Sequence, residues 1–264
     1  MYSTPLNTIE FRVWGRFAMF TDPLTRLGGE KCSYHIPTYE ALKGIVKSIY
    51  WKPTFLWIVD EVRVMKRIRT QTKGTKPLNY GGVYPSARAA GKKQESFNTL
   101  AIYTFLTGDP DPATNVPAVE YQVRAHFEWN LNRPELQKDR IDGKHFEIAR
   151  RMLERGGRQD IFLGTRDCQG YVEPCEFGSG TGDYDGKGQL GFGLMLHSFG
   201  YPDETGANEL QSYFWRPTMA DGILRFPRPE ECPVKKSVRK MQPKRFGVDV
   251  NLRSVNSEAE QTES

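Results

Sequence analysis

Residues 119–130, VEYQVRAHFEWN, carry the pattern that most restricts the fold, because apolar and polar side chains alternate along them without a break. Successive side chains of a β-strand point to opposite faces of its sheet. The segment is therefore predicted to be a strand with one face in the core, to which Ala125 belongs. The other face carries Arg124 and His126, so it faces either solvent or an anionic partner.

A strand, a helix and a second strand are predicted in the first quarter of the chain. Residues 9–20 alternate until Gly15 breaks the pattern, which is typical of a half-buried strand. Residues 37–53 place apolar side chains at helical spacing and predict the clearest helix of the chain. Residues 54–65, TFLWIVDEVRVM, then form the second strand.

The predicted helix also has recognisable ends and a second face. Thr38 is placed to cap its first turn, and Pro53 ends it. Lys43, Lys47 and Tyr50 follow one another at helical spacing, so they share a face apart from the apolar stripe.

The next part of the chain completes a familiar order of elements. Strands are predicted at residues 100–106 and 119–130, and Asp142 caps a helix that ends at Gly156 and Gly157. The order β-α-β, a basic excursion, then β-β-α is that of a ferredoxin-like or RNA-recognition-motif domain. In such α+β folds helices cover one face of an antiparallel sheet, and the other face can bind RNA.

We therefore expect the chain to have three parts. Residues 1–160 form the ferredoxin-like RNA-binding domain, with a basic insertion at about 63–98. Residues 161–233 form a small antiparallel β domain, because short strand patterns alternate there with turn signals. Residues 234–264 form a tail that is basic and then acidic, and that is partly disordered.

The basic insertion leaves two interpretations open. Residues 63–94 contain nine basic residues and no acidic one, with Tyr80 and Tyr84 interleaved. Such a run is often a solvated loop. Because uncompensated charges repel one another, the run equally fits a surface for single-stranded nucleic acid, on which phosphates are neutralised and bases stack.

Several classes of protein do not fit the sequence. The N-terminus lacks a signal-peptide pattern, and no stretch approaches the roughly 20 apolar residues of a membrane span. The four cysteines and four histidines lack zinc-finger or ribbon spacing. The glycine-rich residues 178–193 lack the phosphate-loop pattern. We therefore expect a cytoplasmic protein with reduced thiols, without a metal, a cofactor or a membrane contact.

Several motifs together resemble one known family. They are FRVWGRFAMFTDP, SYHIPTYEALKGIVKSIYWKP, WIVDEVRVMKRI and VEYQVRAHFEWN, followed by IFLGTRDC and by GFGLML, YFWRP and DGILRFP. In order and spacing they resemble CRISPR-associated protein family five in its type I-C form, over most of residues 9–228.

The resemblance implies a fold and a function. The fold is a ferredoxin-like domain followed by a smaller β domain. The function is that of a metal-independent endoribonuclease, which cuts the repeat of precursor CRISPR RNA at the base of its hairpin. The enzyme then keeps the 5′ handle of the crRNA as a subunit of the type I-C interference complex. Its partners are the backbone and large subunits, and target DNA is reached through the complex.

The same resemblance assigns candidate site residues. The family's catalytic tyrosine corresponds to Tyr50 and its catalytic histidine to His126. The family pattern has a lysine directly before that histidine, whereas this chain has Ala125 there. Arg124, Lys47 or Lys52 could supply the missing cation, and loss of nuclease activity is the alternative. Contacts with RNA are expected from Lys43, Lys47, Lys52, Arg67, Arg69, Lys73 and Lys76.

Elementary chemistry suggests a role for each candidate. Cleavage without a metal requires proton transfer at the 2′-hydroxyl and the 5′-oxygen, together with stabilisation of phosphate charge. His126 suits the proton transfer, since an ordinary histidine has a pKa of about 6.5. Arg124 suits the charge stabilisation. Tyr50, with an ordinary pKa of about 10, is better suited to donate a hydrogen bond than to act as a base.

Two other functions are alternatives to the nuclease. The chain could be a structural subunit that caps the 5′ end of a guide RNA while another protein cuts it. It could also be a small-molecule enzyme on a ferredoxin-like fold, but that function explains neither the basic insertion nor the basic tail.

Overall fold

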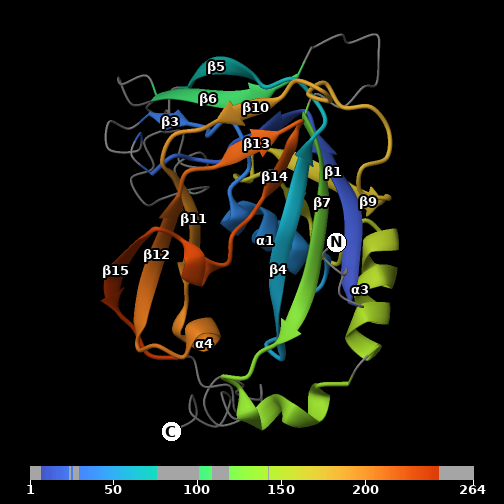
Figure 1. The fold of residues 1–264 in the computed structure, drawn as a ribbon, viewed down its shortest axis with the longest axis vertical. Coiled ribbons are helices and arrows are strands. Elements are labelled where there is room, and N and C mark those ends of the chain that lie inside the picture. Colours follow the sequence, from blue (N-terminus) through green and yellow to red (C-terminus); the bar gives the residue numbers. More distant parts are fainter. Residues whose placement is uncertain are drawn as a thin grey trace, which may run out of the picture.

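The computed structural model describes residues 7–23, 25, 30–75, 101–108, 119–141 and 143–243. Its central feature is an eight-stranded antiparallel sheet, in which β4, β7 and β1 lie side by side (Figure 1). In spatial order its strands are β10 (Gln189–Gly191), β13 (Thr218–Ala220), β14 (Ile223–Arg225), β4 (Phe55–Val64), β7 (Val119–Trp129), β1 (Thr8–Gly15), β9 (Gln169–Pro174) and β8 (Ile161–Phe162).

The middle of this sheet is a ferredoxin-like core. Strands β1, β4, β7 and β9 lie in the order β4-β7-β1-β9, and helices follow the first and third of them in the chain. Helix α1 (Tyr39–Ile49) packs against β4, and helix α3 (Lys144–Glu154) packs against β1 and β9. The two helices contact each other, so they share one face of the sheet. The α+β class predicted from the sequence is confirmed.

Strand β7 has the two-faced character that its alternation predicts. Val123 and Ala125 are fully buried against the helices, and Ala125 lies opposite Ile9 of β1. On the other face, Arg124 lies opposite Glu10 in the register of β1 and β7. The apolar alternation thus determines which side chains of β7 face the core and which charged side chains lie on the opposite face of the sheet.

Two further sheets and three short helices complete the part of the fold that the structure describes. One sheet joins β2 (Phe17–Ala18), β6 (Ala101–Thr107), β3 (Lys31–Cys32) and β5 (Arg69–Thr75). The other joins β11 (Met195–Gly200), β12 (Glu209–Trp215) and β15 (Val234–Lys240). The short helices are η2 (Pro134–Asp139), α4 (Pro202–Thr205) and η3 (Pro229–Glu231).

The sheets cross the boundary expected at residue 160. The predicted third strand, now β6, pairs outside the central sheet, so the ferredoxin-like core takes its fourth strand from β9. Strands β10, β13 and β14 also join the central sheet, next to β4. Among the strands of the expected small β domain, only β11 and β12 lie in a separate sheet. The third strand of that sheet is β15, which comes from the start of the expected tail. Residues 244–264 of that tail lie outside the described residues.

The predicted ends of α1 and α3 can be compared with the structure. The hydroxyl of Thr38 accepts a hydrogen bond from the backbone N–H of Ala41, so the predicted cap is confirmed. Helix α1 ends at Ile49, earlier than Pro53, and Tyr50 is already extended. Gly156 ends α3 with a positive φ, as its sequence predicts, whereas the expected cap Asp142 lies outside the described residues.

Gly164 allows two segments to meet at the far edge of the central sheet. The backbone N–H of Met19 donates to the carbonyl of Leu163 at 2.9 Å. Gly164 has a φ of +99°, and a Cβ atom there would lie 1.9 Å from the Met19 carbonyl oxygen. Only glycine has both the backbone freedom and the lack of a side chain that this crossing requires.

Three properties concern the described residues alone. None of their helices is long and apolar enough to cross a membrane. Their histidine, cysteine and acidic side chains form no group of three or more that could hold a metal ion. The four cysteines are free thiols.

Candidate functional site

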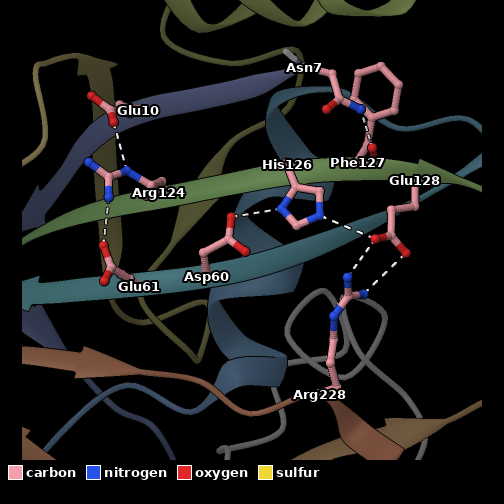
Figure 2. A network of polar contacts seen from close by, with 9 residues as sticks. All are labelled: Asn7, Glu10, Asp60, Glu61, Arg124, His126, Phe127, Glu128 and Arg228. Atoms are coloured by element: carbon pink, nitrogen blue, oxygen red, sulfur yellow. Dashed lines mark hydrogen bonds and ion pairs between the residues drawn. The ribbon is translucent and has the colours of Figure 1, made fainter. Parts of the chain in front are cut away.

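His126 lies between two carboxylates on the face of the sheet opposite the helices. Its Nδ1 atom is 2.8 Å from Oδ2 of Asp60 on β4, and its Nε2 atom is 3.4 Å from Oε1 of Glu128 (Figure 2). Burial alone would lower the pKa of His126, but the two carboxylates together raise it above its ordinary value. Because a carboxylate only accepts hydrogen bonds, this pair of contacts favours the ring with a proton on each nitrogen.

Glu128 is itself held by an arginine from a distant part of the chain. Arg228 donates to both oxygens of Glu128, at 3.1 and 2.5 Å (Figure 2). The hydrogen bonds of Arg228 are the main reason that the pKa of Glu128 is lowered. Asp60, His126, Glu128 and Arg228 therefore form one continuous chain of charged contacts.

Arg124 shares the face of His126, as the alternation predicts, but its charge is already balanced. Its Nε atom is 2.8 Å from Glu10 and its Nη1 atom is 2.7 Å from Glu61 (Figure 2). Its guanidinium also lies over the ring of Phe177, 4.5 Å from the centroid. A phosphate would have to compete with two carboxylates for this arginine.

Tyr50 lies in the core, where 3% of its surface is exposed. Its hydroxyl is 2.9 Å from Nδ1 of His145, and Nε2 of His145 is 2.7 Å from the backbone oxygen of Asp139. Because that carbonyl can only accept, Nε2 of His145 carries the proton and its Nδ1 accepts from Tyr50. Burial mainly, and the nearby Asp139 charge, raise the pKa of Tyr50, which therefore remains a neutral donor.

The structure does not bring Tyr50 and His126 together. The ring of Tyr50 packs on Phe55, and Phe55 packs on Phe127, which is on the helix side of β7. His126 points to the opposite side of the same strand. The reason is that α1 ends at Ile49, so Tyr50 turns into the core instead of continuing the helix face that carries Lys43 and Lys47.

His145 is the partner that sequence reasoning missed, since the sequence alone suggests only a structural role for it. It is fully buried and lies 95 residues from Tyr50 in the chain. No local motif signals such a pair, because the contact exists only once α3 packs beside α1.

The predicted RNA-binding lysines of α1 are engaged with one partly buried acid. Lys43 and Lys47 both form ion pairs with Glu204 of α4, the latter at 2.9 Å. Lys43 is itself buried, so in this conformation it is not available to RNA. Lys52, just beyond the helix, is exposed and lines a cleft of about 630 Å³ at the end of α1.

The structure describes the basic insertion as far as residue 75. Arg63, at its start, is buried and binds Asp185 at 2.7 Å, together with two backbone carbonyls of residues 179 and 180. Arg67, Arg69 and Lys73 are exposed, the last two on β5. Lys76 lies outside the described residues. Arg69–Thr75 thus form a strand with a regular register, whereas residues 76–98 of the insertion lie outside the described residues.

The partner strand of β5 adds aromatic side chains. Lys73 of β5 lies opposite Tyr103 of β6, and on the other side Lys31 of β3 pairs with the same residue. The ammonium of Lys31 is 4.8 Å from the centroid of the Tyr103 ring. Cations thus flank an aromatic ring on this sheet, which is an arrangement suited to phosphates and bases.

Comparison with known proteins gives consistent results. Residues 8–227 match the profile of a family described as CRISPR-associated protein (Cas_Cas5). A Mannheimia succiniciproducens protein named CRISPR pre-crRNA endoribonuclease Cas5d is 28% identical over 152 residues, which cover 57% of this chain and 64% of that protein. A Thermus thermophilus protein of the same name is 28% identical over 207 residues, which cover 76% of this chain and 77% of that protein. The chain thus matches just under two thirds of the Mannheimia protein.

Solved structures agree with the profile. A functionally uncharacterized protein of Streptococcus mutans, SMU1763c, is 33% identical, with a TM-score of 0.66 over 89% of this chain and 99% of that chain. A crystal structure of a CRISPR-associated protein is 32% identical, with a TM-score of 0.65 over 89% of this chain and 98% of that chain.

Proposed function

Because this chain belongs to the Cas5d family of CRISPR-associated proteins, we propose that it cleaves precursor CRISPR RNA and stays bound to the 5′ handle. The observation that carries the proposal is that two relatives, matched over 152 and 207 residues, are both named pre-crRNA endoribonucleases. After cleavage the protein remains a subunit of a type I-C interference complex, together with backbone and large subunits. It meets target DNA only through that complex.

We assign the proton transfer to His126, acting as the acid. Asp60 holds Nδ1 at 2.8 Å, whereas the contact of Nε2 with Glu128 is longer, at 3.4 Å. The proton on Nε2 is therefore the one that a departing 5′-oxygen can take up when RNA displaces Glu128. Arg124, two residues along the strand and roughly 7 Å away, is the cation that takes the place of the family's lysine.

In the same proposal Tyr50 has a supporting role. Its hydroxyl donates to His145 and is a neutral group at ordinary pH. It positions the end of α1 beside the exposed residues 51 and 52, where the RNA path would run. The proposal needs no metal. Solvent water takes the proton of the attacking 2′-hydroxyl, His126 gives a proton to the departing 5′-oxygen, and Arg124 stabilises the phosphate charge.

A non-catalytic role is the second candidate, and two observations favour it. The hydroxyl of Tyr50 is buried on the opposite side of the sheet from His126, and Arg124 is balanced by Glu10 and Glu61. On this alternative the protein only caps the 5′ handle of a guide RNA that another protein has cut.

Cleavage of repeat RNA in EDTA separates the two candidates. We expect the purified protein to cut its cognate repeat at one position in excess EDTA as fast as in Mg²⁺, because proton transfer needs no metal. A 2′-deoxy substitution at the nucleotide before the cut should abolish the product, since the 2′-hydroxyl is the nucleophile. Tight binding of the 5′ handle without any cleavage would establish the capping subunit instead, and cleavage that stops in EDTA would refute the metal-free mechanism.

The exposed cations of the basic insertion should set the salt dependence of RNA binding. Replacing Arg67, Arg69 and Lys73 by alanine should reduce the slope of log affinity against log salt by about 0.7 for each phosphate that is no longer neutralised, so by roughly 2 in all. The matched control is the triple alanine variant of Lys236, Arg239 and Lys240, which are exposed on β15. Filter binding between about 50 and 200 mM salt measures both slopes. Equal slopes for the two variants would show that the cations on and beside β5 do not contact RNA phosphates.

A further inference from the structure

We propose that the cleft at the end of α1 binds one unpaired nucleotide of the RNA, with its base stacked on Trp51 and its phosphate held by Lys52 and Arg158. This inference rests on the proposed function, because it names where an unpaired nucleotide of the same precursor CRISPR RNA is bound. The cleft has a volume of about 630 Å³ and is lined by Lys47, Ser48, Trp51, Lys52, Pro53, Arg158 and Gln159.

The backbone of one wall is fixed by the end of helix α1. Tyr50 has extended dihedral angles, and its carbonyl accepts a hydrogen bond from the indole of the buried Trp57 at 2.7 Å. Adjacent side chains of an extended segment point in opposite directions. Because Tyr50 points into the core, Trp51 points outward, and 40% of its surface is exposed.

The other wall is pinned to the same helix end. The backbone N–H groups of Arg158 and Gln159 donate to the carbonyl of Ser48 at 3.1 and 3.0 Å. The last carbonyls of a helix otherwise lack partners, so these bonds both complete α1 and fix the loop after α3. Gly157, with a φ of +105°, makes the sharp turn that delivers Arg158 to this position.

The charges in the cleft favour an anion. Lys47 is already paired with Glu204, but Lys52 and Arg158 are exposed and form no ion pair within the described part of the chain. None of the residues lining the cleft is acidic. The face of His126 differs in this respect, because Arg124, His126 and Arg228 are each matched there by a carboxylate.

The combination of ring and cations points to a nucleotide. A base stacked on an exposed aromatic ring gains about 1–3 kcal/mol, and nearby lysine and arginine neutralise the adjoining phosphate. An acidic peptide could form ion pairs with Lys52 and Arg158, but it has no flat ring that is required to stack on the indole of Trp51. A bare phosphate would likewise leave Trp51 exposed to water.

The experiment compares RNA affinity for matched aromatic variants of the full chain. Trp51→Ala should weaken binding of repeat RNA by about 30-fold, which corresponds to the middle of the usual stacking range. Trp51→Phe should recover most of the loss, since it retains a ring. The control is Tyr171→Ala, which removes an aromatic residue that is 55% exposed on β9.

A second pair of measurements separates stacking from charge. The double alanine variant of Lys52 and Arg158 should lower the salt slope by about 0.7, from the one phosphate that the two cations hold, whereas Trp51→Ala should leave that slope unchanged. Lys187→Ala, an exposed cation of another loop, serves as the control. Photocrosslinking identifies the nucleotide that lies on Trp51, and an RNA with an abasic site at that position should bind the wild type and Trp51→Ala equally well.

The outcomes distinguish this inference from the proposed function. If the wild type binds no repeat RNA, the proposed function itself fails. If the wild type binds tightly but Trp51→Ala and Tyr171→Ala weaken binding equally, the cleft is not a stacking site. If Trp51→Ala keeps full RNA affinity but no longer copurifies with the other subunits, the cleft belongs to a protein interface and the inference is overturned.

Discussion

His126→Ala is expected to lower the single-turnover rate of repeat-RNA cleavage by about 10²-fold or more, the usual scale for losing a positioned acid. RNA affinity should hardly change, because the histidine is buried within a charged network and most of the binding comes from exposed cations. His35→Ala provides the control, since His35 is exposed and takes no part in this network. Cleavage at full speed by His126→Ala would end the catalytic assignment.

The pH dependence of the same reaction gives a second readout. The pKa of His126 is raised, so the acid form persists above the ordinary pKa of about 6.5, and the rate should fall as pH rises through the raised value. Asp60→Asn removes the strongest supporting contact, so the fall should move to lower pH. A histidine titration followed by NMR in the two proteins measures this shift directly. Identical profiles would show that Asp60 does not tune the acid.

The same shift has a consequence for stability. A histidine with a raised pKa in the folded state stabilises the fold fully below its unfolded pKa of about 6.5. That contribution disappears as pH rises through the raised folded value. Asp60 then loses the charge of His126 and Glu128 keeps only Arg228, so the network becomes less favourable at alkaline pH.

Gly164→Ala is expected to lower the free energy of unfolding by about 3 kcal/mol or more. A strained positive φ costs about 1–3 kcal/mol by itself. The added Cβ would also lie 1.9 Å from the Met19 carbonyl oxygen, so the backbone has to move and the Met19–Leu163 hydrogen bond is strained. Overpacking of this kind adds roughly another 1–3 kcal/mol.

Gly178→Ala is a closely matched control for that variant. Gly178 has a φ of +92°, close to the +99° of Gly164, but no atom lies within 4 Å of the position that its Cβ would take. It should therefore show the backbone cost alone, at about 1–2 kcal/mol. Urea unfolding of the three proteins measures the difference. Equal effects of Gly164→Ala and Gly178→Ala would mean that the close approach to Met19 carries no energy.

The sequence predicted the parts of the fold that follow from local periodicity. The alternation of residues 119–129 and the apolar stripe of α1 depend only on which side chains face the core. For the same reason the burial of Ala125 and the cap at Thr38 are confirmed. Strand order could not be predicted in this way, because only tertiary pairing decides whether β6 or β9 joins β1.

The candidate site was harder to predict for a related reason. The shared face of Arg124 and His126 follows from alternation, but the carboxylates that bind them come from β1, β4 and the neighbouring positions of β7. Helical spacing places Tyr50 on a helix face that in fact ends one residue before it. A difference of a single residue at a helix end, which periodicity alone does not resolve, thus moves its hydroxyl from the surface to His145.

The pairing of β14 with β4 makes this protein dependent on the order in which its chain leaves the ribosome. Arg63 of β4 pairs with Ile223 of β14. The edge of the ferredoxin-like core at β4 therefore lacks its partner strand until about 160 more residues have been synthesised. At typical synthesis rates that interval lasts roughly 10–30 s. During it the edge of β4 offers unpaired backbone groups to other chains. Truncation before residue 223 should therefore yield aggregation rather than a shorter folded domain.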